Sequence, residues 1–300
     1  MIDLEPLVDL ADLAVVRCEG VLPERLRIEL AKIAQRARQR LGYLGDVLVV
    51  AFAGGTGSGK SSLLNAVLGE EVSQVGVARP TTDDALAVIP RDTGPDLGRL
   101  LSDLGVSQRI GASKLKSSVL IDLPDLDSTT EVHRHIVEDV LPRVDAVVWV
   151  FDPEKYADQV IHTEFLAGLA PYESQFIFVL NQVDRLGDDA SQVASDLTRM
   201  LEEDGFGDPR VLTSIASEVE TEVTQLVAAL TGRLSLKRTA ISKLVTDLKI
   251  AANDGWREVG SMAGTDRLED IGPDLMGLAA ATFVSLGVEA TDVLYQIGEG

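Results

Sequence analysis

A run of apolar residues that leads through a glycine-rich loop into a helical pattern is the feature that most constrains how this chain folds. Residues 47–53 read VLVVAFA, residues 54–61 read GGTGSGKS, and from Lys60 the pattern KSSLLNAVLG has helical spacing. Glycines let successive backbone N–H groups turn toward one point, and the helix that follows adds the positive end of its dipole. The stretch therefore predicts a strand, loop and helix that together bind an anion.

Short β-rich runs alternate with helical stretches from about residue 46 to residue 230. The runs are residues 47–53, 85–90, 117–124, 146–152, 175–181 and 210–215. Alternation of this kind is typical of an α/β fold, a mostly parallel sheet covered by helices. The runs are nearly continuous in apolar residues, as expected for strands that are buried on both faces.

Both ends of the chain have helical periodicity and no further strand pattern. The apolar positions at helical spacing are Leu26, Leu30, Ile33, Ala37 and Leu41 near the N-terminus, and Leu234, Ile241, Leu244, Leu248 and Ala251 beyond Gly232. We therefore expect three parts: an N-terminal helical segment 1–44, an α/β domain 45–232 and a C-terminal helical segment 233–300.

The chain is strongly acidic and has a single cysteine. Its net charge of −21 and pI near 4.4 oppose binding to nucleic acid, because an acidic protein repels a polyanion at long range. Cys18 alone excludes an internal disulfide, and the acidic N-terminus lacks the basic start and apolar centre of an export signal. We expect a cytoplasmic protein, with a peripheral position at the inner face of the cell membrane as the alternative.

Two segments bear on contact with a membrane. The longest mostly apolar run, residues 275–288, has 14 residues, whereas a spanning helix needs about 20, so a buried helix is the first interpretation and a shallow membrane contact the second. The N-terminal helical pattern has a basic face, made of Arg25, Arg27, Lys32, Arg36, Arg38 and Arg40. That face is either solvated or a docking face for an acidic partner or a lipid surface.

The glycine loop fits the pattern of Gly, four residues, Gly, Lys, Ser, in the strand-to-helix context that this pattern requires. In such a loop the Lys60 ammonium neutralises charge between the β- and γ-phosphates, and the Ser61 hydroxyl ligates Mg²⁺. The sequence therefore predicts a nucleoside triphosphate site. Its predicted contacts are Gly54, Gly55, Thr56, Gly57, Ser58, Gly59, Lys60, Ser61 and Ser62.

The tetrapeptide NQVD after the fifth run has the spacing of a guanine-recognition motif, with Asn181, Gln182 and Asp184 at the contact positions. The Asp184 carboxylate would accept hydrogen bonds from guanine N1–H and the 2-amino group. Adenine offers neither donor, so it would leave the carboxylate unpaired at a cost of about 1 to 3 kcal/mol. The motif favours GTP and GDP over adenine nucleotides, and an ordinary polar turn is the alternative.

Two further positions are candidates for the metal. Asp122 ends the run 117–124 and would reach Mg²⁺ through water. The segment ARPTTDDA, residues 78–85, could offer a threonine hydroxyl to the metal; we select Thr82, with Thr81 second. A plain turn at Pro80 is the alternative for that segment.

The segments GGTGSGKSS, RPTT, DLPD, NQVD and TSIAS, in this order, resemble the five signature segments of a GTPase (G) domain of the P-loop NTPase class. KSSLLNAVLG and RPTT resemble the Era-like and dynamin-like branch. DLPDLDS and VWVFDPEKYADQVIH resemble an actinomycete group of dynamin-like GTPases. The resemblance implies a G domain flanked by helices and often followed by membrane-associating helices, with Ser214 and Ile215 of TSIAS at the base.

The departures from the family pattern bear on catalysis. Asp125 stands where the family has a glycine, Leu126 where Ras-like proteins have a water-orienting glutamine, and Gln182 where the family has a lysine. We therefore expect slow intrinsic hydrolysis, weakened nucleotide affinity and activation by a nucleotide-dependent homodimer. Arg79 is the candidate for a supplementary catalytic cation beside Lys60 and Thr82, and an ordinary surface arginine is the equal alternative.

Three functions are compatible with the sequence. The first is a Mg²⁺-dependent GTPase that acts as a switch, the second an ATP-driven P-loop protein, and the third a module that binds GTP without hydrolysing it. We do not expect metal binding by His133, His135 or His162, because the first two share no helix face and the third is alone. The polar stretch DPEKYAD, residues 152–158, is either a dimer contact or a plain strand-to-helix connection.

Overall fold

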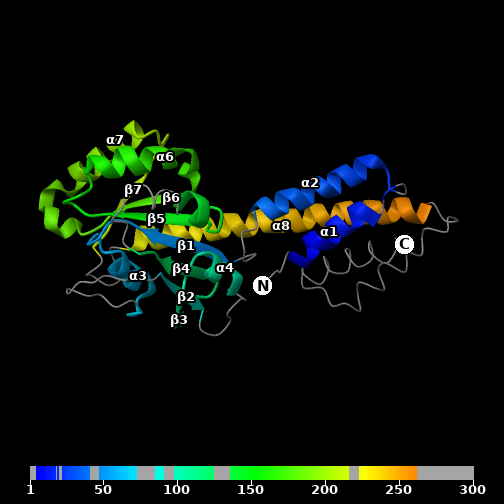
Figure 1. Cartoon of the computed structure of the whole chain (residues 1–300), viewed down its shortest axis with the longest axis horizontal. Coiled ribbons are helices and arrows are strands. Elements are labelled where there is room, and N and C mark those ends of the chain that lie inside the picture. Colours follow the sequence, from blue (N-terminus) through cyan, green and yellow to red (C-terminus); the bar gives the residue numbers. More distant parts are fainter. Residues whose placement is uncertain are drawn as a thin grey trace. The chain divides into compact units, whose positions relative to one another are not determined.

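The computed structural model of the chain describes residues 5–17, 19, 22–40, 47–72, 85–90, 98–124, 136–215 and 223–261 (Figure 1). The chain divides into two units: unit 1 is Met1–Asp46 with Ser235–Gly300, and unit 2 is Val47–Leu234. Both chain ends fall into unit 1, a grouping that the sequence pattern did not indicate.

Strand β1 (Leu48–Ala53) lies at the centre of the seven-stranded sheet of unit 2, whose order is β3-β2-β4-β1-β5-β6-β7. The other strands are β2 (Leu86–Pro90), β3 (Gln108–Ala112), β4 (Ser118–Asp122), β5 (Ala146–Phe151), β6 (Phe176–Leu180) and β7 (Val211–Thr213). Among these strands β2 pairs antiparallel with β4 and the other pairings are parallel. The predicted α/β fold with a mostly parallel sheet is confirmed.

All six predicted runs form strands, and β3 is an additional one. The sequence of β3, QRIGA, has no apolar run, and its first three residues are exposed because it lies at the edge of the sheet. An edge strand that packs few side chains leaves no hydrophobic signal.

The register of the central strands brings their carboxyl ends to one edge of the sheet. Phe52 of β1 lies opposite Asp122 of β4 and Val148 of β5, and Phe151 of β5 lies opposite Leu180 of β6. The chain leaves β1 toward β2 and β4 on one side and later continues to β5 on the other. Ligands of open α/β sheets bind at such a switch point, beyond the carboxyl ends.

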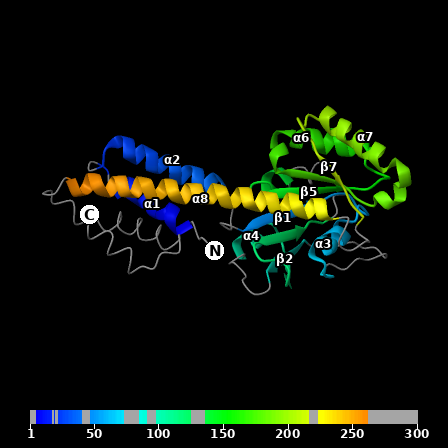
Figure 2. The ribbon, with the colours of Figure 1, turned by 180° about the vertical axis from the view of Figure 1, so that it is seen from behind.

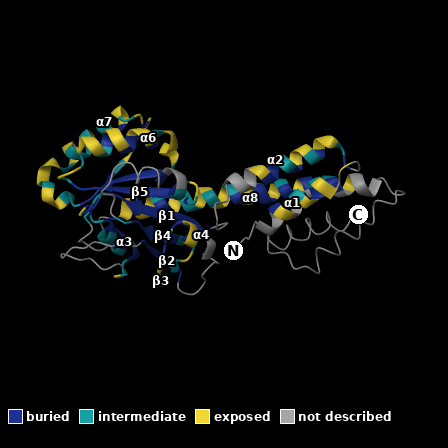
Figure 3. Cartoon of the chain, in the orientation of Figure 1, coloured by how far each residue is buried: buried dark blue, intermediate teal, exposed yellow. Residues whose placement is uncertain are grey.

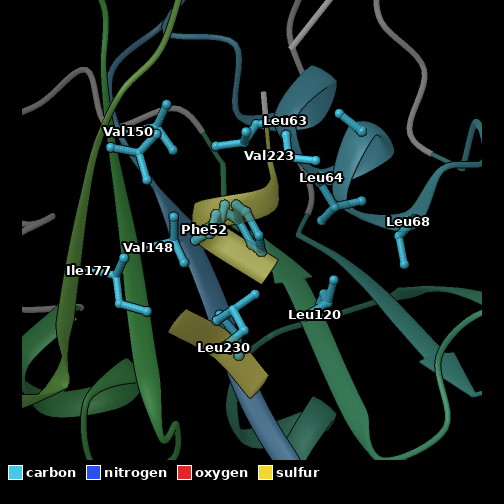
Figure 4. Packing of buried hydrophobic residues seen from close by; sticks show 14 of the residues in the cluster. Phe52, Leu63, Leu64, Leu68, Leu120, Val148, Val150, Ile177, Val223 and Leu230 are labelled. Carbon is cyan, nitrogen blue, oxygen red and sulfur yellow. The ribbon is translucent and has the colours of Figure 1, made fainter. Parts of the chain in front are cut away.

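Helices cover both faces of the sheet (Figures 1 and 2). On one face α3 (Lys60–Leu68) and the beginning of α8 (Thr224–Ser261) pack against β1, and Figure 4 shows Phe52, Leu63 and Leu230 in this shared core. The other helices in the described part of unit 2 are α4 (Gly98–Asp103), η1 (Ile136–Val140), η2 (Ile161–Leu166), α6 (Ala167–Leu169), η3 (Ala170–Gln175), η4 (Val183–Asp189) and α7 (Ala190–Glu203).

An aromatic cluster fills the core on the side of β5 and β6 that α3 does not cover. Phe178 meets Phe206 edge-to-face with 5.0 Å between ring centroids, and Phe176 stacks on Phe178 at 5.8 Å. Trp149 and Phe151 extend the cluster along β5. Aromatic pairs of this geometry add about 0.5 to 1.5 kcal/mol beyond the burial of their area, so they hold β5 and β6 firmly side by side.

Unit 1 contains α1 (Glu5–Arg17), α2 (Glu24–Arg40) and the part of α8 from Ser235 onward. Its buried faces, dark blue in Figure 3, confirm most of the predicted apolar positions: Leu26, Leu30, Ile33, Ile241, Leu244, Leu248 and Ala251. Leu234 of unit 2 is half-buried, and the side chains of Ala37 and Leu41 lie outside the described residues.

Neither segment predicted to bear on membrane contact is described in full. None of the described helices combines the length and apolar character that crossing a membrane requires. Residues 275–288 lie outside the described residues. On the basic face of α2, Arg25 and Lys32 are exposed and Arg27 forms an ion pair with Glu19 at 3.3 Å, whereas the side chains of residues 36–40 are not described.

Candidate functional site

The glycine loop, residues 54–61, joins β1 to α3, and glycine is required at two of its positions. Gly54 and Gly59 have φ angles of 149° and 84°. A Cβ atom on Gly54 would lie 2.4 Å from the carbonyl oxygen of Val150, and one on Gly59 would lie 2.4 Å from Nδ2 of Asn181. Both positions therefore combine a positive φ with a close approach that excludes any side chain.

Four side chains donate hydrogen bonds to the carbonyl oxygens of the glycine loop. Lys60 Nζ donates to the oxygens of Gly54 (2.9 Å) and Gly55 (3.4 Å). The others are Lys155 Nζ to Thr56 (3.1 Å), Gln182 Nε2 to Gly57 (2.9 Å) and Asn181 Nδ2 to Ser58 (2.9 Å). In a planar trans peptide the C=O and the following N–H point to opposite sides. An engaged carbonyl therefore turns the N–H that follows it away from the donating side chain, as an anion-binding nest requires. The Ser58 N–H is used within the loop, where it donates to the Gly55 oxygen at 3.2 Å.

Lys60 and Ser61 begin α3 at the end of the loop. Lys60 is only 4% exposed, and its ammonium lies against the loop carbonyls. The Ser61 hydroxyl donates to Oδ2 of Asp122 at 2.7 Å, and Asp122 is 2% exposed at the end of β4. The structure thus brings together two of the three residues that the sequence predicted for Mg²⁺.

This donor set fits a magnesium ion held between protein and phosphate. A hydroxyl and a carboxylate are hard oxygen ligands, which Mg²⁺ prefers. Within the described part of the chain, no group of three or more His, Cys, Asp or Glu residues could hold a metal ion by itself. The ion would therefore take its remaining ligands from phosphate and water, as is usual for Mg²⁺ at nucleotide sites. The buried Ser58 hydroxyl, which has no hydrogen-bond partner among the described residues, is a further polar atom of the loop.

Asn181 ties the loop to the ends of β6 and β7. Its amide donates to the Ser58 oxygen, and its Oδ1 accepts a hydrogen bond from the Ser214 hydroxyl at 3.0 Å. Asn181 is 0% exposed and Ser214 is 1% exposed. Both residues therefore direct their polar atoms into the protein. Asp184, the predicted reader of the base, is exposed in η4, and Ile215 is half-buried.

Gln182 keeps a hydrogen bond to the loop although it replaces a lysine of the family pattern. It has a φ of 57°, the left-handed conformation, which aims its amide at Gly57. Its Oε1 accepts a hydrogen bond from Arg185 Nη1 at 2.8 Å, and Arg185 forms an ion pair with Glu154. The positive charge that a lysine would carry at residue 182 is therefore absent, but the guanidinium of Arg185 lies against the Gln182 side chain.

Sequence reasoning did not identify Lys155, Glu154 and Arg185 as part of the site. The available signal was position, because the polar stretch 152–158 directly follows β5 and Arg185 directly follows Asp184, both at the carboxyl edge of the sheet. Neither stretch carries a motif that indicates contact with the glycine loop. Their contact with the loop becomes visible only in three dimensions.

Several predicted residues lie outside the described residues. They are Arg79, Thr81, Thr82, Asp125, Leu126, His133 and His135. His162 is described and buried: its Nδ1 lies 2.5 Å from Oδ2 of Asp204, and its Nε2 lies 2.7 Å from the carbonyl oxygen of Tyr156. Because a carbonyl only accepts, Nε2 is the donor in the second contact. Both ring nitrogens are thus used within the protein.

The sequence model of a family described as 50S ribosome-binding GTPase matches residues 49–182. The match covers less than half of the chain and lies wholly within unit 2. It spans the glycine loop, the Ser61–Asp122 pair and the beginning of the NQVD tetrapeptide. No curated protein matches the chain.

Solved structures with a similar fold include a chain of an oligomerised bacterial dynamin pair, described as providing a mechanism for the long-range sensing and tethering of membranes. It is 14% identical with a TM-score of 0.51, over 86% of this chain and 47% of that one. Another chain described in the same terms is 16% identical with a TM-score of 0.47, over 100% and 64%. Toc33 from Arabidopsis thaliana in complex with Mg²⁺ and GMPPNP is 15% identical with a TM-score of 0.44, over 75% and 98%.

The present chain spans about half the length of the first of these structures, and identities this low bear on the fold alone. The family match over residues 49–182 and the sheet topology show that unit 2 has the α/β fold of a P-loop GTPase domain. Domains of this family bind guanine nucleotides.

Proposed function

We propose that unit 2 binds GTP and GDP together with Mg²⁺ and hydrolyses GTP to GDP and phosphate. The observation that carries this proposal is the conformation of the glycine loop, whose carbonyls at residues 54–58 all accept hydrogen bonds from side chains. A glycine loop that is held from its carbonyl side in this way, next to a buried lysine, is suited to a polyphosphate.

Residues of the glycine loop and of two other segments have separate roles in binding and catalysis. The Lys60 ammonium and the loop amides would neutralise charge on the β- and γ-phosphates. Ser61, Thr82 and, through water, Asp122 would hold the metal. Bound Mg²⁺ would supply further charge neutralisation at the phosphate oxygens. Phosphoryl transfer depends mainly on such charge placement and on an in-line water, so no general base is required.

Asp184 reads the base in this proposal. Its exposed carboxylate accepts hydrogen bonds from guanine N1–H and the 2-amino group, while Asn181 and Ser214 hold the turn in place from inside the protein. Adenine would leave the carboxylate unsatisfied, at about 1 to 3 kcal/mol or about 10- to 100-fold in affinity. Guanine nucleotides are therefore the expected ligands.

A nucleotide-dependent homodimer supplies the two groups that one chain lacks for catalysis, a residue that orients water and a supplementary cation. Leu126 cannot orient water, and the supplementary cation is assigned to Arg79. The fold likeness to an oligomerised bacterial dynamin pair supports an assembly of this kind. We extend the proposal to a dynamin-like switch at the inner face of the membrane, with residues 275–288 as the lipid contact.

Calorimetric titration with GTP, GDP and ATP in the presence of Mg²⁺ tests the ligand. We expect saturable binding of both guanine nucleotides and binding of ATP that is at least about tenfold weaker. Equal affinity for GTP and ATP would overturn the assignment and favour an ATP-driven protein.

Phosphate release measured against protein concentration tests the reaction. We expect turnover per molecule to rise with concentration as the homodimer forms, and Arg79→Ala to abolish that rise while leaving nucleotide affinity intact. A tight GTP complex without phosphate release at any concentration would leave only a binding module. Unchanged stimulation in the variant would remove Arg79 from the mechanism.

A further inference from the structure

Lys155 reaches the glycine loop from a segment 99 residues away. Its Nζ donates to the carbonyl oxygen of Thr56 at 3.1 Å. The turn that carries it, residues 152–158, is held by Asp152, whose Oδ1 accepts hydrogen bonds from the N–H groups of Glu154 (2.9 Å) and Lys155 (3.1 Å). Asp152 itself is buried. The ammonium of Lys155 is therefore aimed at the loop by a constrained turn.

A second set of contacts reaches the next carbonyl of the loop. Glu154 pairs with Arg185, Arg185 donates to Gln182, and the amide of Gln182 donates to the oxygen of Gly57. Gln182 adopts a left-handed conformation to make this contact, a conformation that costs a residue with a side chain about 1 kcal/mol or more. The surrounding contacts offset that cost.

The two contacts act on consecutive peptide groups. The carbonyl of Thr56 shares a planar peptide with the N–H of Gly57, and the carbonyl of Gly57 shares one with the N–H of Ser58. A hydrogen bond to the carbonyl oxygen fixes the orientation of the peptide, and one from a cation such as Lys155 also makes the opposite N–H a stronger donor. The Lys155 ammonium thus strengthens the Gly57 N–H as a donor to an anion. The Gln182 amide instead fixes the peptide whose N–H, that of Ser58, donates to the Gly55 oxygen at 3.2 Å and closes a turn of the loop.

We infer that Lys155 and Arg185 are positioning residues for the polyphosphate, Lys155 by direct contact with the loop and Arg185 through Gln182. Together they place positive charge beside the loop, which residue 182 itself, a glutamine where the family pattern has a lysine, does not carry. This inference rests on the proposed function, because it takes the anion in the loop to be the phosphates of a guanine nucleotide.

A double-mutant cycle on the full chain separates positioning from simple stabilisation. The readouts are the Kd of a fluorescent GDP analogue with Mg²⁺ and the melting temperature without nucleotide. We expect Lys155→Met and Arg185→Met each to raise Kd about tenfold. In a Gln182→Lys background we expect Arg185→Met to change Kd less than about twofold, because a lysine at residue 182 reaches Gly57 without help.

Lys114→Met is the matched control. Lys114 is also an exposed lysine whose Nζ donates to a backbone carbonyl, that of Gly69 at 3.4 Å, at the other end of α3. We expect its removal to leave Kd unchanged. Lys155 is exposed and the Arg185 side chain is 46% exposed, so both variants should fold, and the melting temperature checks this.

The outcomes distinguish the inference from the proposed function. Equal penalties for Arg185→Met in both backgrounds, or equal effects of Lys155→Met and Lys114→Met, would overturn the inference while wild-type binding of GDP stands. A wild-type chain without affinity for GDP would overturn the proposed function and the inference with it.

Discussion

The Ser61 hydroxyl donates a hydrogen bond to Asp122 across 2.7 Å, which joins the first turn of α3 to the end of β4 over 61 residues of sequence. The contact exists because β1 and β4 are parallel neighbours in register, with Phe52 opposite Asp122. It sets a hydroxyl and a carboxylate at the point where a metal ion would meet the phosphates of a nucleotide in the glycine loop.

Ser61→Ala should remove the dependence of GTP affinity on magnesium. The wild-type chain should lose about tenfold or more in affinity when Mg²⁺ is chelated, because the ion joins protein oxygens to phosphate oxygens. The variant should bind GTP equally weakly with and without Mg²⁺. The control is Ser113→Ala, which removes an exposed hydroxyl that donates to the carboxylate of Glu70. If the Ser61→Ala variant lost as much GTP affinity as the wild type when Mg²⁺ is chelated, Ser61 would not be a ligand of the metal.

Asp184→Asn should change which base the site prefers. An asparagine presents an amide donor where the aspartate presents only acceptors, and xanthine carries a carbonyl where guanine carries the 2-amino group. GTP affinity should fall about 10- to 100-fold, and xanthosine triphosphate should bind more tightly than GTP. Competition between the two nucleotides measures the change. Asp188→Asn, an exposed acid in the same helix η4, should leave the preference for GTP unaltered.

Gly59→Ala should destabilise the chain even without nucleotide. The new Cβ would meet Nδ2 of Asn181 at 2.4 Å, at a φ of 84°, so it both strains the backbone and displaces the hydrogen bond from Asn181 to Ser58. We expect a loss of about 1 to 3 kcal/mol in the free energy of unfolding, measured by urea denaturation. Gly55→Ala adds a Cβ that meets nothing within 4 Å, so it should cost much less. Equal losses in the two variants would refute this account of Gly59.

The buried contact between Asp204 and His162 should make stability depend on pH. Burial raises the pKa of Asp204 above its ordinary value of 3.8, while the hydrogen bond with His162 lowers it. A raised pKa means that the folded state binds the proton more tightly than the unfolded state. The contribution of this carboxyl to stability is therefore present below pH 3.8 and is lost as pH rises through the raised pKa.

Asp204→Asn should remove that dependence while keeping a hydrogen bond to Nδ1 of His162, because its amide can donate there. The wild type should be more stable than the variant by a free energy of unfolding that becomes smaller as pH rises. The comparison runs from the lowest pH at which both proteins are folded to pH 7. Urea titrations across this range provide the measurement. A difference that is flat, or that grows with pH, would show that burial does not dominate at Asp204.

Local sequence was sufficient for six strands of the sheet and for the glycine loop. The six apolar runs form strands, the faces of α2 and α8 are buried where helical spacing predicted, and the glycine loop connects β1 to α3. These features follow from short-range rules of strand composition, helical periodicity and glycine conformation, which act over a few residues.

Tertiary structure decided which side chains hold the loop. Lys155, Asn181 and Gln182 lie 99, 123 and 125 residues from the carbonyls that they contact, and no local pattern encodes those distances. The antiparallel pairing of β2 and the edge strand β3 were likewise absent from the pattern. The physical reason is that a hydrogen bond between remote segments depends on the register of parallel strands, which side chains across the whole sheet set together by packing.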